Sequence, residues 1–301
     1  MSIQKAVIPL AGLGTRLYPV STVIPKGLLP FVLADGSVAT GIQLIIEDAL
    51  RAGIEKICLV VHPESLEQYQ RFFDGYIDRY AAALALKPEL SRQRERLVEM
   101  KARIEYAFQD RPLGFGHAVW CASDFADGDP ALVLLGDHLV ISDGESCSAQ
   151  LMRAYDTVGA TTIGVHRIDA SRVNLYGILR GQATTDPELY EALDIVEKPT
   201  ERLAADQLQT QTLPSGQFLA HFGLFAFTGG IWDALDELVG SHSDDEEIQL
   251  TTAERMLVDR EPCYAYEIDG SSLDFGIASG YAEAFQSVSR SVFPSQLTVS
   301  S

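Results

Sequence analysis

The sequence predicts an α/β fold of the Rossmann-like type, in which helices flank a mixed, largely parallel sheet. Three observations support this prediction. Short apolar stretches alternate with helical periodicity in the first half of the chain, the first apolar stretch ends in a glycine-containing loop, and the second half has more strand patterns. The chain has 301 residues, 47% of them hydrophobic, and no linker or internal repeat divides it. We therefore expect one domain over residues 1–301.

Strands and helices are expected to alternate up to about residue 140. Residues 6–10 form an apolar run, and residues 40–52 place apolar side chains at helical spacing before Gly53, a typical helix cap. The charged, helical composition of residues 63–100 indicates an insertion outside the sheet. The other elements expected in this half are strands over residues 56–61, 103–108 and 131–135 and a helix over residues 115–122.

The second half of the chain has more strand character. Residues 181–187 are expected to form the tip of a hairpin, and residues 294–301 are expected to be frayed. The expected strands cover residues 161–167, 176–180, 193–198, 218–227 and 264–268, and the expected helices cover residues 231–238 and 250–258.

Composition and charge exclude several classes of protein. The formal net charge is −19 at pH 7, so the chain does not attract nucleic acid or an anionic membrane non-specifically. No stretch reaches the roughly 18 continuous apolar residues of a membrane span, and the N-terminus has no signal-type leader. The four cysteines are widely spaced, which argues against structural zinc and fits reduced thiols. We therefore expect a cytoplasmic protein.

The loop after the first expected strand has the composition of a phosphate-binding loop. Gly12 and Gly14 let the backbone approach an anion closely, and bare loop amides bind phosphate oxygens. Arg16 adds a forked cation and Lys26 adds a point charge, and this combination favours a triphosphate over a neutral ligand. The alternative interpretation is a structural turn with a surface arginine and lysine.

Better-known nucleotide motifs do not fit the chain. A Walker loop ends in Gly-Lys-Ser/Thr, which is absent after these glycines, and the dinucleotide fingerprint needs a third glycine where this chain has Leu17. The string Asp274-Phe275-Gly276 also occurs in protein kinases, but no His-Arg-Asp loop precedes it and the glycine loop lacks the kinase spacing.

Two aspartates that follow expected strands are candidates for a metal site. Asp137 comes after an apolar run and a glycine, and Asp274 ends another expected strand. Ligands of open α/β sheets lie beyond the carboxyl ends of the strands, where carboxylates can hold Mg²⁺ together with substrate phosphates. Each aspartate alone is also compatible with capping a helix or a turn.

Gln109 ends an expected strand just before a loop that contains Gly114. A glutamine amide offers a donor and an acceptor, so Gln109 can pair with the edge of a pyrimidine while Gly114 presents backbone groups to the same base. A plain polar loop before a helix is the alternative. We interpret His117, at the start of that helix, as a capping or packing residue and not as a catalyst.

Opposite charges stand side by side at the end of a later strand. Adjacent strand side chains point to opposite faces, so Glu197 and Lys198 need not pair with each other. Glu197 can accept hydrogen bonds from sugar hydroxyls and Lys198 can hold a sugar phosphate, whereas a solvated hairpin end is the alternative. Gly177 is typical of a strand position where another group approaches closely.

Together, these motifs resemble those of bacterial glucose-1-phosphate uridylyltransferases, within the superfamily of sugar-phosphate nucleotidyltransferases. The matching strings occur in the order of the family and extend over nearly the whole chain. They cover residues 6–16, 24–26, 114–119, 196–199, 247–251, 274–276 and 280–281.

The resemblance implies a nucleotidyltransferase or GT-A-like fold and Mg²⁺-dependent joining of UTP and glucose 1-phosphate to UDP-glucose and pyrophosphate. Residues 1–140 would mainly bind the nucleotide and residues 141–301 the sugar phosphate. By match to the family motifs, the expected contacts are Leu10, Ala11, Gly12, Gly14 and Thr15 with the catalytic cations Arg16 and Lys26 for the triphosphate, Gln109 and Gly114 for the base, Asp137 and Asp274 for magnesium, and Gly177, Glu197 and the catalytic Lys198 for the sugar phosphate.

The chain departs from the family pattern next to these expected sites. The departures leave thymidylyl transfer, or uridylyl transfer to a different sugar 1-phosphate, as alternatives. A catalytically inactive regulatory protein that binds sugar nucleotides is a second alternative, although both aspartates and three cations remain. The sequence is also compatible with a homo-oligomer. The departing positions are Gly27 for glutamate, residues 34–39 for a Lys-Pro pair, His138 after Asp137, Phe275 for cysteine, and Ile277 and Ala278 for Asn-Lys.

Overall fold

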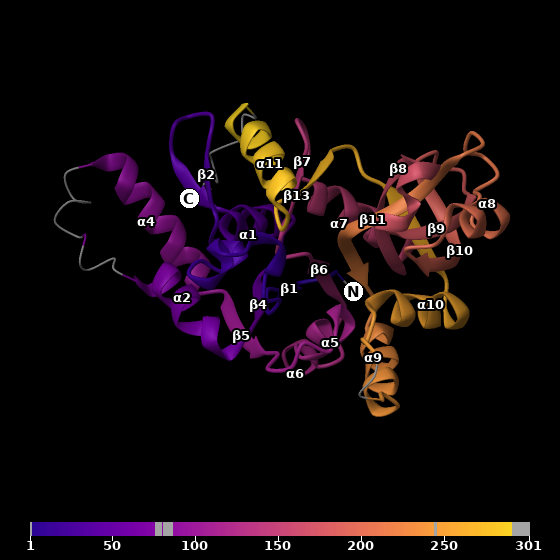
Figure 1. Ribbon diagram of the computed structural model, residues 1–301, viewed down its shortest axis with the longest axis horizontal. Coiled ribbons are helices and arrows are strands. Elements are labelled where there is room, and N and C mark those ends of the chain that lie inside the picture. The colour runs from indigo at the N-terminus through magenta and orange to yellow at the C-terminus, as the bar shows by residue number, and fades with distance from the viewer. Residues whose placement is uncertain (1, 76–79, 81–86, 244–245, 291–301) are drawn as a thin grey trace.

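A nine-stranded mixed sheet runs through the centre of the protein (Figure 1). The computed structural model describes residues 2–75, 80, 87–243 and 246–290. Two small two-stranded sheets accompany the central sheet: β2 (Pro30–Val32) pairs with β3 (Val38–Thr40), and β7 (His138–Ile141) pairs with β13 (Ser271–Asp274). In spatial order, the central strands are β5 (Ile104–Phe108), β4 (Lys56–Val61), β1 (Lys5–Pro9), β6 (Ala131–Leu134), β11 (Gln217–Phe227), β8 (Thr161–Asp169), β12 (Cys263–Glu267), β10 (Leu189–Glu197) and β9 (Gly177–Ala183).

The two halves of the sheet differ in strand direction. β5, β4, β1 and β6 are parallel, as expected for strands that alternate with helices. β11 then runs antiparallel to β6 and β8, and β10 runs antiparallel to β12 and β9. The expected mixed α/β fold is therefore confirmed, with most of its parallel pairs in the first half of the chain and one more, β12 with β8, in the second half. The expected hairpin is also present, since β9 ends at Ala183 and β10 begins at Leu189.

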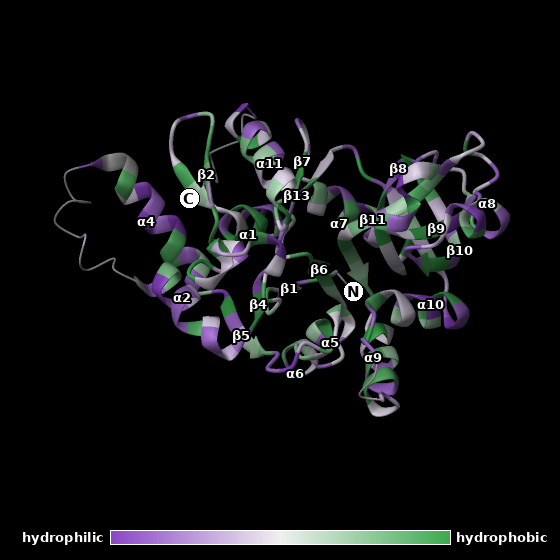
Figure 2. Cartoon of the chain, viewed as in Figure 1, coloured by the Kyte–Doolittle hydropathy of each residue, from purple (hydrophilic) through white to green (hydrophobic). Residues whose placement is uncertain are grey.

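Helices cover both faces of the sheet because neighbouring strand residues point to opposite sides. In β1, Ile8 packs into the core that α1, α7 and α11 cover, whereas Val7 packs into the core beneath α5, α9 and α10. Figure 2 shows the central strands β4 and β6 as predominantly hydrophobic. The α-helices of the described residues are α1 (Gly41–Arg51), α2 (Leu66–Gln70), α4 (Pro88–Lys101), α5 (Phe115–Trp120), α6 (Ser123–Ala126), α7 (Cys147–Val158), α8 (Glu201–Gln207), α9 (Gly230–Gly240), α10 (Leu250–Arg260) and α11 (Ala278–Arg290).

Local sequence signals set the ends of α1. The Thr40 hydroxyl accepts a hydrogen bond from the Gln43 backbone N–H (3.3 Å), which satisfies one of the free donors at the start of the helix. After the helix, Gly53 adopts a left-handed φ of 91°, which a glycine reaches without strain. The helix expected over residues 40–52 is thus confirmed.

The expected insertion is helical and lies at one end of the molecule. Short turns, η4 (Pro63–Ser65) and η5 (Arg71–Gly75), flank α2 and precede α4, which extends away from the sheet in Figure 1. Residues 76–79 and 81–86 of this insertion lie outside the described residues. The chain end that was expected to be frayed, residues 294–301, lies outside them as well.

Candidate functional site

The buried carboxylate of Asp137 lies just beyond the carboxyl end of β6, where only 4% of the residue is exposed. Its Oδ2 lies 2.7 Å from Lys26 Nζ, and its Oδ1 lies 3.0 Å from His138 Nδ1. Burial by itself raises the pKa of this carboxyl, but Lys26 and His138 outweigh burial and hold the pKa well below its usual range. Asp137 is therefore ionised at neutral pH.

The loop that contains Gly12 and Gly14 lies next to the Lys26 ammonium. Lys26 begins the short turn η3 (Lys26–Leu28), and a Cβ atom on Gly12 would lie 3.6 Å from its Nζ. Gly14, with a φ of 64°, leads into η1 (Thr15–Leu17), whose Thr15 and Arg16 are exposed.

Within the same loop, the strand-side residues are less available to a ligand. Leu10 and Ala11 are buried, and the Leu10 amide donates to the Val60 carbonyl (2.7 Å) and so continues the sheet. The amides that an anion can reach therefore begin after Leu10.

The small β7–β13 sheet brings Asp274 to Asp137. Asp274 pairs with His138 in the β13–β7 register, and the next amide, that of Phe275, donates to the Asp137 carbonyl (2.9 Å). Asp274 Oδ2 lies 3.9 Å from the exposed Arg16 guanidinium. The structure thus brings Arg16, Lys26 and the two aspartates together.

The donor set between the two aspartates fits a divalent cation. One ligand atom each from Asp137, His138 and Asp274 lie within 4.8 Å of one another. A Cβ atom on Gly276 would lie 2.5 Å from Asp137 Oδ2 and 3.0 Å from Asp274 Oδ1, so a glycine there keeps the space between the carboxylates open. Oxygen ligands of this kind suit Mg²⁺, and the added imidazole was not predicted from the sequence.

Gln109 and Gly114 are direct neighbours. The buried Gln109 side chain donates from Nε2 to the Gly114 carbonyl (3.0 Å) and lies 3.0 Å from His117 Nδ1. Gly114 has a φ of 106°, and a Cβ atom there would lie 2.6 Å from the Ile248 carbonyl oxygen. His117 also stacks on Trp120 and burial lowers its pKa, in keeping with a packing role.

Gly177, Glu197 and Lys198 meet at the open end of the β9–β10 hairpin. Gly177 lies opposite Glu197 in the register, and a Cβ atom on Gly177 would overlap His221, 1.8 Å from its Nε2. Lys198 has a left-handed φ of 45°, so it leaves the strand alternation, and its Nζ lies 3.3 Å from Glu197 Oε1. The two charges therefore do pair.

A cluster of buried polar side chains packs against Glu197 and was not predicted from the sequence. Thr251 donates to Glu197 Oε2 (2.8 Å), and His221 Nε2 lies 3.7 Å from the same oxygen. Burial opposes a charged His221, but Glu254 and Glu197 outweigh it and raise the pKa of the imidazole.

Glu254 completes this group from α10. It is only 1% exposed, neither of its carboxylate oxygens has a hydrogen-bond partner among the described residues, and burial raises its pKa to about 7. A sequence signal existed, since Glu254 shares the inner face of α10 with the buried apolar residues Leu250, Ala253 and Leu257.

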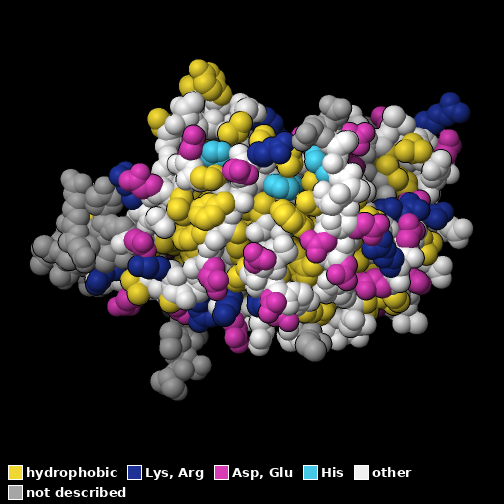
Figure 3. Space-filling view, turned by 90° about the horizontal axis from the view of Figure 1, so that it is seen from below, with side chains coloured by type: hydrophobic (Ala, Val, Ile, Leu, Met, Phe, Trp, Pro, Cys, Tyr) yellow, Lys and Arg dark blue, Asp and Glu magenta, His cyan; other side chains and the backbone are white. Residues whose placement is uncertain are grey.

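The segment before α10 and the first turn of α10 connect two of these groups of side chains. The Ile248 amide donates to the Leu113 carbonyl (2.7 Å) and the Ile248 carbonyl accepts from the Gly116 amide (2.8 Å), which holds the loop around Gly114. Thr251, inside α10, donates to Glu197. In the space-filling view, the visible histidine side chains gather near a notch in the outline, beside basic and acidic side chains (Figure 3).

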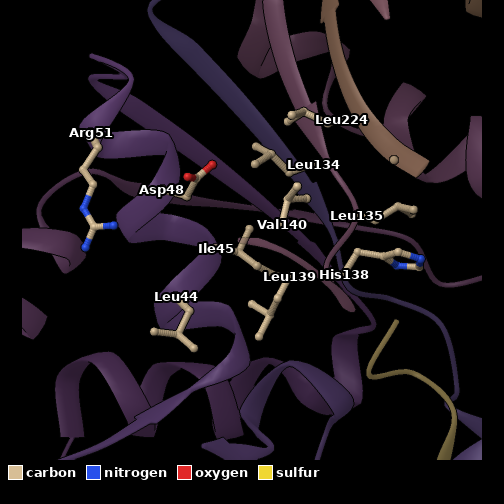
Figure 4. A pocket seen from close by; sticks show the side chains of 11 residues that line it. Leu44, Ile45, Asp48, Arg51, Leu134, Leu135, His138, Leu139, Val140 and Leu224 are labelled. Carbon is tan, nitrogen blue, oxygen red and sulfur yellow. The ribbon is translucent and has the colours of Figure 1, made fainter. Parts of the chain in front are cut away.

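A small pocket beside the Asp137 group is mostly aliphatic. Leucine and isoleucine side chains from α1, β6 and β7 line it together with Asp48 and Arg51 of α1, and His138 lies at its edge with its ring pointing away from Leu44 and Ile45 (Figure 4). Aliphatic walls do not suit phosphates, so we place the candidate site at the charged groups and not in this pocket.

Comparison with known proteins agrees with this geometry. The family model described as nucleotidyl transferase matches residues 5–291, so the chain belongs to this family. It is similar to two UTP–glucose-1-phosphate uridylyltransferases of Bacillus subtilis strain 168. YngB is 33% identical over 94% of this chain and 88% of its own length, and the second is 35% identical over 93% of this chain and 88% of its own.

Solved structures of the same kind share the fold. A UDP-glucose pyrophosphorylase in complex with UDP-glucose has a TM-score of 0.75 at 29% identity, over 95% of this chain and 98% of that one. The UTP-bound enzyme from Acinetobacter baumannii has a TM-score of 0.73 at 30% identity, over 95% and 93%. Among the described residues, no helix is long and apolar enough to cross a membrane.

We expect the Glu254 carboxyl to make stability depend on pH. Its pKa is about 7 in the folded chain against a usual value of 4.5, so between these values only the folded state keeps the proton. The free energy of unfolding should therefore fall as pH rises from about 4.5 to 7. In Glu254→Gln this titration is absent, so the free energy of unfolding should fall by up to about 3 kcal/mol less over this pH range than in the wild type.

Urea unfolding at several pH values between about 5 and 8 measures this dependence. Glu201→Gln, which removes an exposed carboxyl at the start of α8, is the matched control and should keep the wild-type slope. A Glu254→Gln chain with the wild-type slope would show that Glu254 is not the titrating group.

Proposed function

We propose that the protein is a UTP–glucose-1-phosphate uridylyltransferase, which joins UTP and glucose 1-phosphate to UDP-glucose and pyrophosphate. The observation that carries the proposal is the meeting of a glycine loop, Lys26 and two strand-end carboxylates in a chain of the nucleotidyl transferase family. The substrates of the Bacillus subtilis relatives, as their names state them, support the choice of UTP and glucose 1-phosphate.

In this reaction, an oxygen of the sugar phosphate attacks the α-phosphorus of UTP in line. A new P–O bond forms as the bond to the β-phosphate oxygen breaks, and pyrophosphate leaves with the electron pair. No protein nucleophile is needed because the attacking oxygen is already anionic. The protein instead has to position two polyanions and balance their charge.

The cations around the site suit that task. Lys26 and Arg16 stand beside the loop of Gly12, Gly14 and Thr15, where they would stabilise the triphosphate and the departing pyrophosphate. Lys198, the residue after β10, would hold the phosphate of the sugar.

We infer that Asp137 and Asp274 hold the divalent ion, which we propose to be Mg²⁺ as in the sequence prediction. When bound, the ion supplies positive charge to the phosphate oxygens. The ionised state of Asp137 and the open space at Gly276 support this assignment.

Gln109 and Gly114 would recognise the base, and Glu197 and Gly177 would recognise the sugar. Gln109 fixes the carbonyl of Gly114 and thereby the loop that would face the uracil, since its amide nitrogen binds that carbonyl. Glu197 would accept hydrogen bonds from sugar hydroxyls, next to Gly177. The four cysteines are free thiols, which fits the cytoplasmic location that we propose.

A matrix of nucleoside triphosphates against sugar 1-phosphates, with pyrophosphate detection, tests the proposal. Pyrophosphate release should be fastest with UTP and glucose 1-phosphate in the presence of Mg²⁺. Asp137→Asn protein, purified in the same way, is the control for activity that comes from contaminating enzymes. A faster reaction with dTTP or another sugar would contradict the assigned substrates. Binding of UDP-glucose without turnover of any pair would favour the regulatory alternative.

We expect substitutions of Glu197, the last residue of β10, and of Lys198 after it to change kcat/KM in different ways. Lys198→Ala should lower kcat/KM for every sugar 1-phosphate by a similar factor, since all carry the same phosphate. Glu197→Gln keeps the shape but weakens the acceptor, so the penalty should differ by about 10-fold between glucose and galactose 1-phosphates. Glu201→Gln, near them in sequence but exposed, is the control.

The measurement is kcat/KM for both sugar phosphates in the three variants and the wild type. Equal penalties for both sugars in Glu197→Gln would mean that Glu197 does not contact the hydroxyl that distinguishes them.

A further inference from the structure

The His138 side chain reaches the candidate metal site because of a turn between β6 and β7. The His138 amide donates to the Leu135 carbonyl (3.4 Å), so Asp137 lies within the turn and not in a strand. Side chains of consecutive strand residues would point to opposite faces, but here His138 Nδ1 lies 3.0 Å from Asp137 Oδ1. His138 also stands opposite Asp274 in the β7–β13 register.

The imidazole has no competing role in the described structure. Its contact with Asp137 is the one hydrogen bond that its ring makes to a described residue. Its side chain is 15% exposed, and its ring points away from Leu44, Ile45 and Leu139 of the neighbouring pocket (Figure 4). The His138 ring therefore offers a nitrogen atom within 4.8 Å of a carboxylate oxygen of each aspartate.

The charges of the site are unfavourable for an ion that relies on carboxylates alone. Lys26 lies 2.7 Å from Asp137 and Arg16 lies 3.9 Å from Asp274, so each carboxylate already faces a cation. Mg²⁺ binds through charge and oxygen ligands and loses affinity when that charge is balanced. A neutral imidazole nitrogen adds no charge, but it is a strong ligand for first-row transition ions.

We propose that His138 is a third protein ligand of the divalent ion and raises the affinity of the site for transition ions such as Mn²⁺ without a matching gain for Mg²⁺. The inference rests on the proposed metal site between Asp137 and Asp274 and adds to it a ligand and a selectivity. Removal of His138 should then weaken Mn²⁺ binding and leave Mg²⁺ binding nearly unchanged.

Direct binding measurements on the nucleotide-free protein test the selectivity. Titration calorimetry gives the dissociation constants of Mn²⁺ and Mg²⁺ for the wild type and for His138→Asn. We expect the Mn²⁺ constant to rise by about 10-fold or more in the variant, and the Mg²⁺ constant to change by less than about 3-fold. His62→Asn, which removes the imidazole that caps η4 and lies outside the group of Asp137, His138 and Asp274, is the matched control and should leave both constants unchanged.

Electron spin echo spectroscopy of bound Mn²⁺ tests the ligand itself. The wild-type complex should show coupling to a directly bound ¹⁴N nucleus, and His138→Asn should lose it. Because the coupling is measured in the wild type, this readout remains decisive even if the variant folds poorly.

Two outcomes would overturn the inference, namely no nitrogen coupling in the wild type or an unchanged ratio of Mn²⁺ to Mg²⁺ affinity in folded His138→Asn. Failure of the underlying site looks different. Asp137→Asn and Asp274→Asn would then bind Mn²⁺ as tightly as the wild type, which would place the ion elsewhere.

Discussion

A carboxylate buried as deeply as that of Asp137 needs a cation beside it, because an isolated charge in the interior costs several kcal/mol. Lys26 supplies the cation from a segment 111 residues earlier in the chain. This ion pair joins the end of β6 to η3, and the loop of Gly12 lies against the same ammonium. The loop of Gly12 and the proposed metal ligand Asp137 thus both contact Lys26.

The rest of the site is arranged around the ends of the strands. The Asp137 carbonyl accepts the Phe275 amide, which places Asp274 beside it, and the small β7–β13 sheet holds both. The segment before α10 fixes the loop near Gly114, and Thr251 at the start of α10 fixes the carboxylate of Glu197. An acidic protein can therefore present cations locally, since each one lies next to a carboxylate that positions it.

Local patterns were sufficient to predict the parallel half of the sheet, α1 and the strand-end position of Asp137, because these depend on continuous apolar runs and on nearby caps. The motifs shared with the family also led to residues that do lie together, such as Gln109 with Gly114. The pairing of β7 with β13 was not predicted, because its two short strands are more than a hundred residues apart and carry no local signal. α7, α8 and α11 were likewise missed.

Side-chain direction was the harder problem. The rule that neighbouring strand residues point apart did not hold for Glu197 and Lys198, because Lys198 has a left-handed backbone and its side chain pairs with Glu197. The buried group of His221 and Glu254 depends on three separate elements, so spacing along the chain could not reveal it.

A double-mutant cycle on the unfolding free energy tests the central ion pair most directly. Lys26→Met and Asp137→Asn should each destabilise the protein by about 3–5 kcal/mol, since each leaves a mostly buried group without its partner. The double variant should lose less than the sum of the two, with a coupling energy above about 1 kcal/mol. Losses that simply add would contradict the account, because they would show that Lys26 and Asp137 do not hold each other in place.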